Sequence, residues 1–316
     1  MTGRKHFSDV SLIVRECGER TADVCVRRIH ELLGETPHRI SARPFSATLR
    51  QSLELGARLA RPWTLCIDAD VLVLPGLIEF IEQVRDIPEN IFEAQALVID
   101  KLIPMRRPAG NHIYRTNLID LALPLIPTAN SLRPESDMIL AMQESGHPAW
   151  QARTIIGVHD FEQNYEDIYK KAFLHGHKHD YLMSRIRPIW EALRRNDSDF
   201  AMALLALEDA ARHGVTPDIS RSYMDSESRI AAQQLGLHPK ARLEHVSDSE
   251  LLEMTQYCNV LEGEARRLAD GLQFDVDAAM FPAADSTSSP TPANWIDICN
   301  ASFRRALQMF SAIVKR

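Results

Sequence analysis

The stretch Trp63-Thr-Leu-Cys-Ile-Asp-Ala-Asp-Val-Leu-Val-Leu-Pro-Gly76 decides the fold. Its first five residues are mostly apolar or β-branched and predict a buried strand that ends directly in Asp68. Pro75 stands at a favoured first helical position and predicts a helix that continues through Val84. A buried strand followed by a helix is the repeating unit of an α/β sheet.

The neighbouring residues repeat this alternation of strand and helix. Apolar runs predict strands over 10–14, 38–42 and 92–99, and helical spacing predicts helices over 20–33 and 45–59. Strand, helix and strand in this order favour parallel pairing with right-handed crossovers. Ligands of such sheets bind beyond the carboxyl ends of the strands, which is where Asp68 lies.

The rest of the chain has a different organisation. Residues 100–160 are rich in proline and are expected to be irregular, apart from a short helix over 136–145 that ends at Gly146 and a strand over 150–156. Apolar residues recur at helical spacing over 161–282. A small-polar linker and an amphipathic segment follow over 283–316. We therefore expect three parts: a catalytic core over 1–160, a helical extension over 161–282, and the linker with its C-terminal helix.

The composition limits the class of protein. Apolar residues make up 45% and charged residues 25%, as in ordinary globular proteins, and the net charge of -7 argues against a nucleic-acid partner. The N-terminal residues lack an apolar signal region, and no run is long and apolar enough to span a membrane. The five cysteines are scattered without C-x-x-C spacing, which indicates reduced thiols. These features predict a cytoplasmic protein.

Asp68 and Asp70 follow the buried strand with one residue between them. Two such carboxylates can hold one divalent cation, and Mg²⁺ and Mn²⁺ prefer carboxylate and phosphate oxygens. A metal on a diphosphate also neutralises the charge that develops when a nucleotide leaves. The alternative is a solvated turn before the helix at Pro75, because a bare D-x-D triplet often occurs by chance.

Three segments carry a resemblance to a known family. Cys66–Gly76 resembles the metal-binding strand end of family 2 glycosyltransferases and their GT-A relatives. The segment 47–56 resembles the helix just upstream, with Arg50 at the family's arginine and Gln51 in place of its asparagine. Val10–Arg15 resembles the first strand of the nucleotide site.

The resemblance covers roughly residues 8–160 and implies an α/β fold of the GT-A type. That fold is a Rossmann-like core of nucleotide-diphospho-sugar transferases, here with a helical C-terminal extension. It also implies a nucleotide-sugar donor and a Mg²⁺ or Mn²⁺ cofactor. Asp68 then faces the ribose and Asp70 ligates the metal, and the nucleotide pocket is lined by Arg15, Glu16 and Arg50. Ser41-Ala-Arg-Pro44 replaces the family's aspartate-rich turn, which leaves the nucleotide base open.

The stretch 133–146 resembles the acidic motif that supplies the general base in inverting GT-A enzymes. It places Glu135 in the base position and Asp137 two residues beyond it. A carboxylate there can take the proton of the acceptor hydroxyl. Acidic residues in a first helical turn also stabilise the helix dipole, so a structural role stays open beside the catalytic one.

Histidines form the last candidate group. His159 follows the final predicted strand, and the resemblance implies a late histidine that completes the metal site. The alternative is a surface or packed histidine, with Asp160 as the N-cap of the next helix. His175, His177 and His179 predict a polar helix face near the acceptor site, with metal binding as the less favoured alternative.

These observations predict an inverting, metal-dependent glycosyltransferase that transfers a sugar to a hydroxyl acceptor, a surface glycan or a lipid-linked one. A nucleotidyltransferase and a non-catalytic scaffold are the alternatives. The segment from Trp295 to Arg316 predicts either an anchor at the inner face of a membrane or a packing or homodimerisation helix.

Overall fold

A computed structural model describes residues 7–127, 131–178, 180–213 and 221–271. The chain divides into two compact units, Met1–Ala265 and Arg266–Arg316, and the description below concerns the first. The linker and C-terminal helix expected over 283–316 lie outside the described residues, as does His179. No helix within the described ranges combines the length and apolarity needed to cross a bilayer.

An eight-stranded mixed sheet forms the centre of this unit. Its strands are β1 (Val10–Arg15), β2 (His38–Ile40), β3 (Trp63–Asp68), β4 (Val71–Val73), β5 (Glu93–Asp100), β6 (Met105–Pro108), β7 (Asn111–Arg115) and β8 (Ala149–His159). The order is β2-β1-β3-β7-β5-β8-β4, and β6 pairs with β5. β1 runs parallel to β2 and β3, and β5 runs parallel to β8. β7 is antiparallel to both β3 and β5, and β4 is antiparallel to β8.

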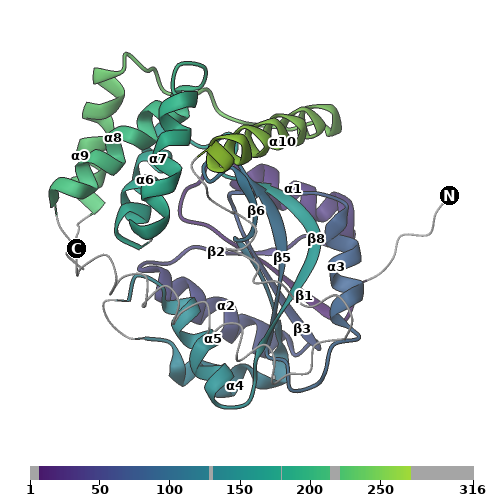
Figure 1. Cartoon of the computed structure of the whole chain (residues 1–316). Helices are drawn as coiled ribbons and strands as arrows, with labels where there is room; N and C mark the ends of the chain where they lie inside the picture. Colours follow the sequence, from purple (N-terminus) through teal and green to yellow (C-terminus); the bar gives the residue numbers. More distant parts are fainter. Residues whose placement is uncertain (1–6, 128–130, 179, 214–220, 272–316) are drawn as a thin grey trace. The chain divides into compact units, whose positions relative to one another are not determined.

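The sheet is strongly curled near Asp68. Only Ala69 and Asp70 separate β3 from β4, yet three strands lie between them in the sheet order. Two intervening residues span at most about 11 Å, whereas four strand spacings in a flat sheet measure about 19 Å. The sheet therefore bends until the ends of β3 and β8 approach each other, as the curved ribbons of Figure 1 show.

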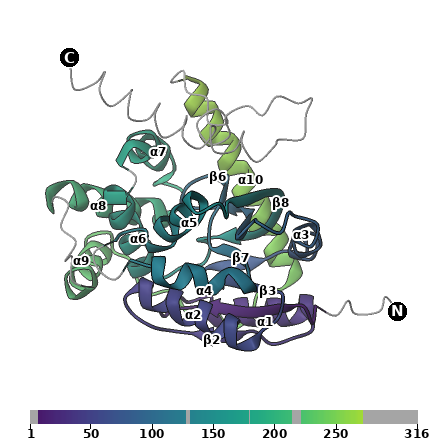
Figure 2. The same cartoon turned by 90° about the horizontal axis from the view of Figure 1, so that it is seen from below.

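Helices cover both faces of the sheet (Figures 1 and 2). Side chains alternate along β1, so that Leu12 and Val14 pack in the core beneath α1 (Ala22–Leu33) and α3 (Gly76–Val84). Ile13 points the other way, into a core formed with α2 (Phe45–Leu59), α4 (Ile119–Ala122) and α5 (Pro134–Glu144). Short 3-10 turns, η1 (Thr116–Leu118) and η2 (Leu123–Leu125), flank α4.

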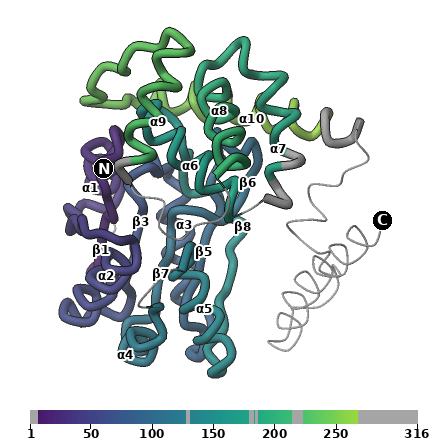
Figure 3. The backbone as a smooth tube through the Cα atoms, turned by 90° about the vertical axis from the view of Figure 1, so that its left-hand side faces the viewer, coloured from purple at the N-terminus to yellow at the C-terminus, as the bar shows by residue number. Residues whose placement is uncertain are grey.

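In the described part of the chain, five helices follow β8: α6 (Tyr165–Lys178), α7 (Asp180–Leu193), α8 (Ser198–His213), α9 (Arg221–Gln234) and α10 (Asp248–Gly271). Helices α6, α8 and α9 pack side by side (Figure 3). Buried polar contacts join the later helices to the residues just after β5. The Trp190 indole on α7 donates to the Leu102 carbonyl at 2.6 Å. The Lys101 ammonium also lies 2.5 Å from a carboxylate oxygen of Asp199.

The expected α/β core followed by helices is confirmed. The helix expected over 136–145 and the strand expected over 150–156 are confirmed as α5 and β8. Two expectations were wrong: the stretch between β5 and α5 is not irregular throughout, and the pairing is not all parallel, because this stretch contributes β6 and the antiparallel β7. β7 has no apolar alternation because its polar residues Asn111 and His112 are buried as well as its apolar ones. The division at residues 160 and 282 stays a prediction.

Candidate metal and nucleotide site

The strand registers bring four polar side chains to one end of the sheet. β4 pairs with β8 so that Val71 lies opposite His159, which puts Asp70 beside Asp160. The Asp160 amide donates to the Asp70 carbonyl at 3.2 Å. Asp100, the last residue of β5, lies beside His159 in the parallel register. The site is therefore built by pairing between strands that are distant in sequence.

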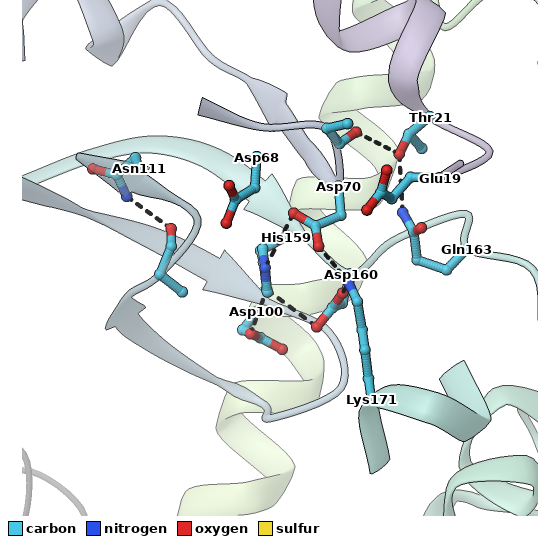
Figure 4. Close-up of polar contacts among 12 residues, drawn as sticks. Glu19, Thr21, Asp68, Asp70, Asp100, Asn111, His159, Asp160, Gln163 and Lys171 are labelled. Carbon is cyan, nitrogen blue, oxygen red and sulfur yellow. Dashed lines mark hydrogen bonds and ion pairs between the residues drawn. The ribbon is translucent and has the colours of Figure 1, made fainter. Parts of the chain in front are cut away.

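Hydrogen bonds hold the turn between the two aspartates (Figure 4). The Ala69 amide donates to the Arg15 carbonyl at 2.9 Å, and the Thr21 hydroxyl donates to the Ala69 carbonyl at 2.7 Å. Gln163 supports Thr21 in turn, because its amide donates to that hydroxyl at 3.0 Å. The fixed turn directs Asp68 and Asp70 to different neighbours.

Gly110 allows the closest packing behind this site. Its carbonyl accepts the Asp68 amide at 2.8 Å, and its φ of 62° lies in the left-handed region. A Cβ atom there would lie 2.7 Å from a methyl of Val71 and 3.2 Å from the ring of His159. The position therefore requires glycine.

Asp70, His159 and Asp160 form a group that can hold a metal ion. Their exposed fractions are 7%, 7% and 3%, and one potential ligand atom from each lies within 4.8 Å of the others. Oδ1 of Asp70 and Oδ2 of Asp160 are buried and have no hydrogen-bond partner among the described residues. Buried carboxylate oxygens in proteins are normally paired or coordinate metals.

The donor set fits Mg²⁺ or Mn²⁺. Ligand atoms that share one such ion at about 2.1 Å lie at most about twice that distance apart. The observed 4.8 Å requires only a small approach of the side chains. Carboxylate oxygens and an imidazole nitrogen are suitable ligands for these ions.

Asp100 orients the His159 ring. Nδ1 of His159 lies 2.7 Å from Oδ2 of Asp100, and Asp100 itself is held by Arg107 at 2.6 Å. With Nδ1 directed at Asp100, Nε2 on the other side of the ring faces Oδ1 of Asp70 at 3.4 Å. Burial lowers the pKa of His159, but the carboxylates of Asp160, Asp70 and Asp100 outweigh it and raise that pKa to about 10. A carboxylate behind a ligating histidine is the usual arrangement at metal sites.

Lys171 reaches the group from α6. Its ammonium contacts a carboxylate oxygen of Asp70 and another of Asp160 (Figure 4). Burial alone raises the pKa of Asp70, but Lys171 and His159 outweigh that effect and hold it well below its usual range. The Asp70 carboxylate therefore stays ionised.

A second buried group contains Arg15, Glu135 and the side chains that contact them. The Arg15 guanidinium donates to Asp68 at 2.7 Å and also to Oε1 of Glu135. Oε1 accepts a further bond from the Tyr114 hydroxyl, and Oε2 lies 3.0 Å from Nε2 of His112. Burial raises the pKa of Glu135, but Arg15 and His112 outweigh it and hold that pKa well below its usual range. Nη2 of Arg15 is buried and has no hydrogen-bond partner among the described residues.

The predicted residues thus divide between the two groups and the surface. Asp70 and His159 come together in the first group, and the second group unites Arg15, Asp68 and Glu135.

Three of the predicted residues belong to neither group. Glu16 pairs with Arg39 at 2.6 Å, and Arg50 is half-buried on α2. Asp137 is exposed on α5, where its carboxylate accepts a bond from the Ser131 hydroxyl.

Sequence reasoning missed several members of these groups. The alternative that Asp160 caps the next helix is wrong, because α6 begins only at Tyr165. Asp100 ends a buried strand as Asp68 does, and that shared position was a usable signal. Lys171 carried no signal, because it is one of several polar residues on a helix.

His175 and His177, the two described histidines of the run, are not part of a metal group. In the described part of the chain, Asp70, His159 and Asp160 are the only such group that is found. His177 instead packs edge-on against Phe173, with ring centroids 5.0 Å apart. His175 is half-buried on the same helix.

Comparison with known proteins gives similarities of structure only. No protein-family model matches the sequence, and no curated protein matches it. Membership of glycosyltransferase family 2 therefore stays a prediction.

Among solved structures, a glycosyltransferase involved in glycosylation of the major capsid of PBCV-1 is 12% identical. It covers 48% of this chain and 92% of its own, with a TM-score of 0.35. The mannosyltransferase PcManGT of Pyrobaculum calidifontis, in complex with GDP-Man and Mn²⁺, is 12% identical over 85% of this chain and 88% of its own, with a TM-score of 0.35. A CMP:2-keto-3-deoxy-manno-octonic acid synthetase complexed with CTP is 11% identical over 46% and 90%, with a TM-score of 0.33. None of these similarities assigns an activity.

Proposed function

We propose that this chain is a metal-dependent glycosyltransferase that takes a sugar from a nucleoside diphosphate sugar and transfers it to a hydroxyl acceptor. The observation that carries the proposal is the buried group of Asp70, His159 and Asp160, with two carboxylate oxygens that lack hydrogen-bond partners. Asp70 comes just after the buried strand β3. Ligands of α/β sheets bind beyond the carboxyl ends of such strands. The resemblance of Cys66–Gly76 to GT-A enzymes supports the sugar-transfer chemistry.

Asp70, His159 and Asp160 hold Mg²⁺ or Mn²⁺ in this proposal. A divalent ion held by these residues would supply positive charge that neutralises the departing diphosphate. Asp100 fixes the ring of His159 through the 2.7 Å contact, so that Nε2 faces Oδ1 of Asp70 and would be available to a metal ion.

Asp68 and Arg15 bind the nucleotide. Their 2.7 Å ion pair holds both side chains in one orientation. Nη2 of Arg15 is a buried donor that has no hydrogen-bond partner in the described part of the chain, and a nucleotide oxygen would satisfy it. Glu16 and Arg50 complete the pocket in the proposal, with weaker support because neither contacts Arg15 or Asp68 in the described hydrogen bonds.

Asp137 is the better supported general base of the two predicted carboxylates. It is exposed at the start of α5, where an acceptor hydroxyl can reach it. Both oxygens of Glu135 already accept hydrogen bonds, and its depressed pKa makes it a weak proton acceptor. We therefore assign to Glu135 the orientation of Arg15. Inversion at the anomeric carbon follows if Asp137 acts alone.

The acceptor in this proposal is a surface glycan or a lipid-linked sugar. The reaction then takes place in the cytoplasm or at the inner face of a membrane. The catalytic core spans residues 1–160 and the helical extension spans 161–282, which the proposal places on the acceptor side.

The test is a turnover screen with UDP-, GDP-, CDP- and TDP-sugars in Mn²⁺, with EDTA as the metal-free arm. We expect one donor to release its nucleoside diphosphate, and Asp70→Asn to abolish that release. Asp86→Asn, an exposed aspartate after α3, is the matched control and should keep full turnover.

Two outcomes would contradict the proposal. Release of pyrophosphate from a nucleoside triphosphate and a sugar phosphate would indicate a nucleotidyltransferase. Failure of every nucleotide to bind or turn over, with or without Mn²⁺, would leave a non-catalytic scaffold.

A further inference from the structure

We infer that Lys171 is an intrinsic cation that exchanges with the divalent ion at Asp70 and Asp160 and, once displaced, binds the diphosphate of the donor. This inference rests on the proposed function, since it concerns the same metal group. It assigns to α6 a role in the loading of the site.

The contacts of Lys171 show why the exchange is required. Its ammonium contacts one oxygen of Asp70 and one of Asp160, while the other oxygen of each carboxylate has no hydrogen-bond partner. A divalent ion that used both carboxylates would lie next to this ammonium. Two cations at such a separation repel strongly in a buried site.

Charge balance supports the same conclusion. Asp70 and Asp160 are nearly fully buried, and buried carboxylates need a cation close by. Lys171 and the His159 ring, whose nitrogens lie 3.4 Å from Oδ1 of Asp70 and 3.2 Å from Oδ2 of Asp160, meet that need when no divalent ion is bound. Arg107 already belongs to Asp100 at 2.6 Å, so it does not replace Lys171 at Asp70.

The displaced ammonium needs a new anionic partner. Its side chain is 22% exposed, so it can move without unpacking α6. The donor diphosphate is the anion that arrives with the metal, and lysine binds phosphate well as a compact charge. Lys171 should therefore weaken metal binding and strengthen diphosphate binding.

The first experiment measures Mn²⁺ affinity of the full chain, from the electron paramagnetic resonance signal of free Mn²⁺ at fixed pH. We expect Lys171→Met to bind Mn²⁺ about tenfold more tightly than the wild type, a shift of the size that one neighbouring charge produces. Lys170→Met is the matched control, because Lys170 pairs with Asp225 at 2.7 Å and should leave Mn²⁺ affinity unchanged.

The second experiment measures UDP and GDP affinity by calorimetry at saturating Mn²⁺. Lys171→Met should bind whichever nucleotide the wild type prefers about tenfold more weakly. A purely structural lysine would not change the two affinities in opposite directions. If Lys171→Met does not fold, Lys171→Arg replaces it; the retained charge should keep Mn²⁺ affinity at or below that of the wild type.

The outcomes separate this inference from the proposed function. If Asp70→Asn loses Mn²⁺ while Lys171→Met binds it no more tightly than the wild type, the exchange is wrong and the metal site survives. Unchanged nucleotide affinity in Lys171→Met would refute the diphosphate contact. If neither the wild type nor Lys171→Met binds Mn²⁺ with or without nucleotide, both the metal site and the exchange are wrong.

Discussion

The group around Asp70 and the group around Glu135 are both buried and acidic, yet they leave opposite atoms without partners. The first leaves two carboxylate oxygens, on Asp70 and Asp160, and the second leaves a guanidinium nitrogen on Arg15. Unpaired acceptors suit a cation, whereas an unpaired donor suits an anionic or hydroxyl oxygen. A metal and a nucleotide together present both kinds of partner.

The two groups also differ in how their central carboxylate is held. Glu135 accepts bonds from an arginine, a tyrosine and a histidine, which satisfy both of its oxygens. Asp70 has one oxygen on Lys171, and its other oxygen meets only His159 at 3.4 Å. Two buried carboxylates can therefore have different roles. The unsatisfied oxygen of Asp70 suits a metal ligand, whereas the fully bonded Glu135 orients its neighbours.

The largest effect is expected on Mn²⁺ affinity. Asp70→Asn should weaken it by roughly 1000-fold, beyond the 10–100-fold typical of residues that support a metal ligand. Asp100→Asn, which only orients His159, should fall within that smaller range. Glu135→Gln serves as the control from the other group and should leave Mn²⁺ binding intact. A comparable loss in Glu135→Gln would remove the distinction between the groups.

The next effect concerns catalysis. Asp137→Asn should lower kcat by about 100-fold, because it removes the proton acceptor, and should leave nucleotide affinity unchanged. Glu135→Gln should mainly raise the donor KM, because it releases Arg15. Steady-state kinetics with the donor found in the screen measure both. The reverse pattern would return the base to Glu135.

Stability should fall with rising pH through His112. Burial lowers its pKa, but Glu135 and Glu93 outweigh this and raise it to about 9, above an unfolded value of 6.5. The folded protein then binds the extra proton, so this stabilisation is complete below about pH 6.5 and is lost as the pH rises through about 9. Arg15 and Tyr114 also lie within this group and do not reverse the sign.

Urea unfolding of the wild type and His112→Gln at several pH values checks this prediction. The free energy of unfolding of the wild type should fall by up to about 1.4 kcal/mol per pH unit within the window, relative to the variant. Parallel profiles for the two proteins would show that His112 is not charged in the folded state.

The smallest effect is expected at Phe45, whose ring lies 5.2 Å from the guanidinium carbon of Arg15 and is part of a residue that is 43% exposed. Phe45→Leu should cost about 0.5–1 kcal/mol in stability, the usual size of an exposed cation–π contact. Denaturant unfolding measures it. A loss several times larger would mean that Phe45 holds Arg15 in place more firmly than its exposure suggests.

Much of the first 100 residues follows from local patterns. The helix predicted over 45–59 matches α2, and the strand that ends in Asp68 matches β3. The helix predicted over 20–33 matches α1, and Gly34 forms its left-handed C-cap with φ of 78°. Period and cap signals are local, so they are readable without knowledge of the neighbours.

The strands that the sequence did not predict share a physical reason. In β7 the polar residues Asn111 and His112 are buried, and the side-chain amide of Asn111 forms hydrogen bonds with the backbone of Ala96 in β5. In the sequence these polar residues looked like loop residues. β4 is only three residues long and lies directly after the aspartates, where a turn was expected. Both strands exist because of partners elsewhere in the chain, which composition does not record.

The sequence by itself determined the alternating strands and helices and put Asp68 and Asp70 at the end of a buried strand. Only the tertiary structure decided that these aspartates enter two different groups, and that Asp160 and Lys171 join Asp70. Lys171 lies 101 residues from Asp70, and their contact depends on the β4–β8 register and the packing of α6. Periodicity reports local burial, whereas a binding site is made by contacts between segments that only the folded chain brings together.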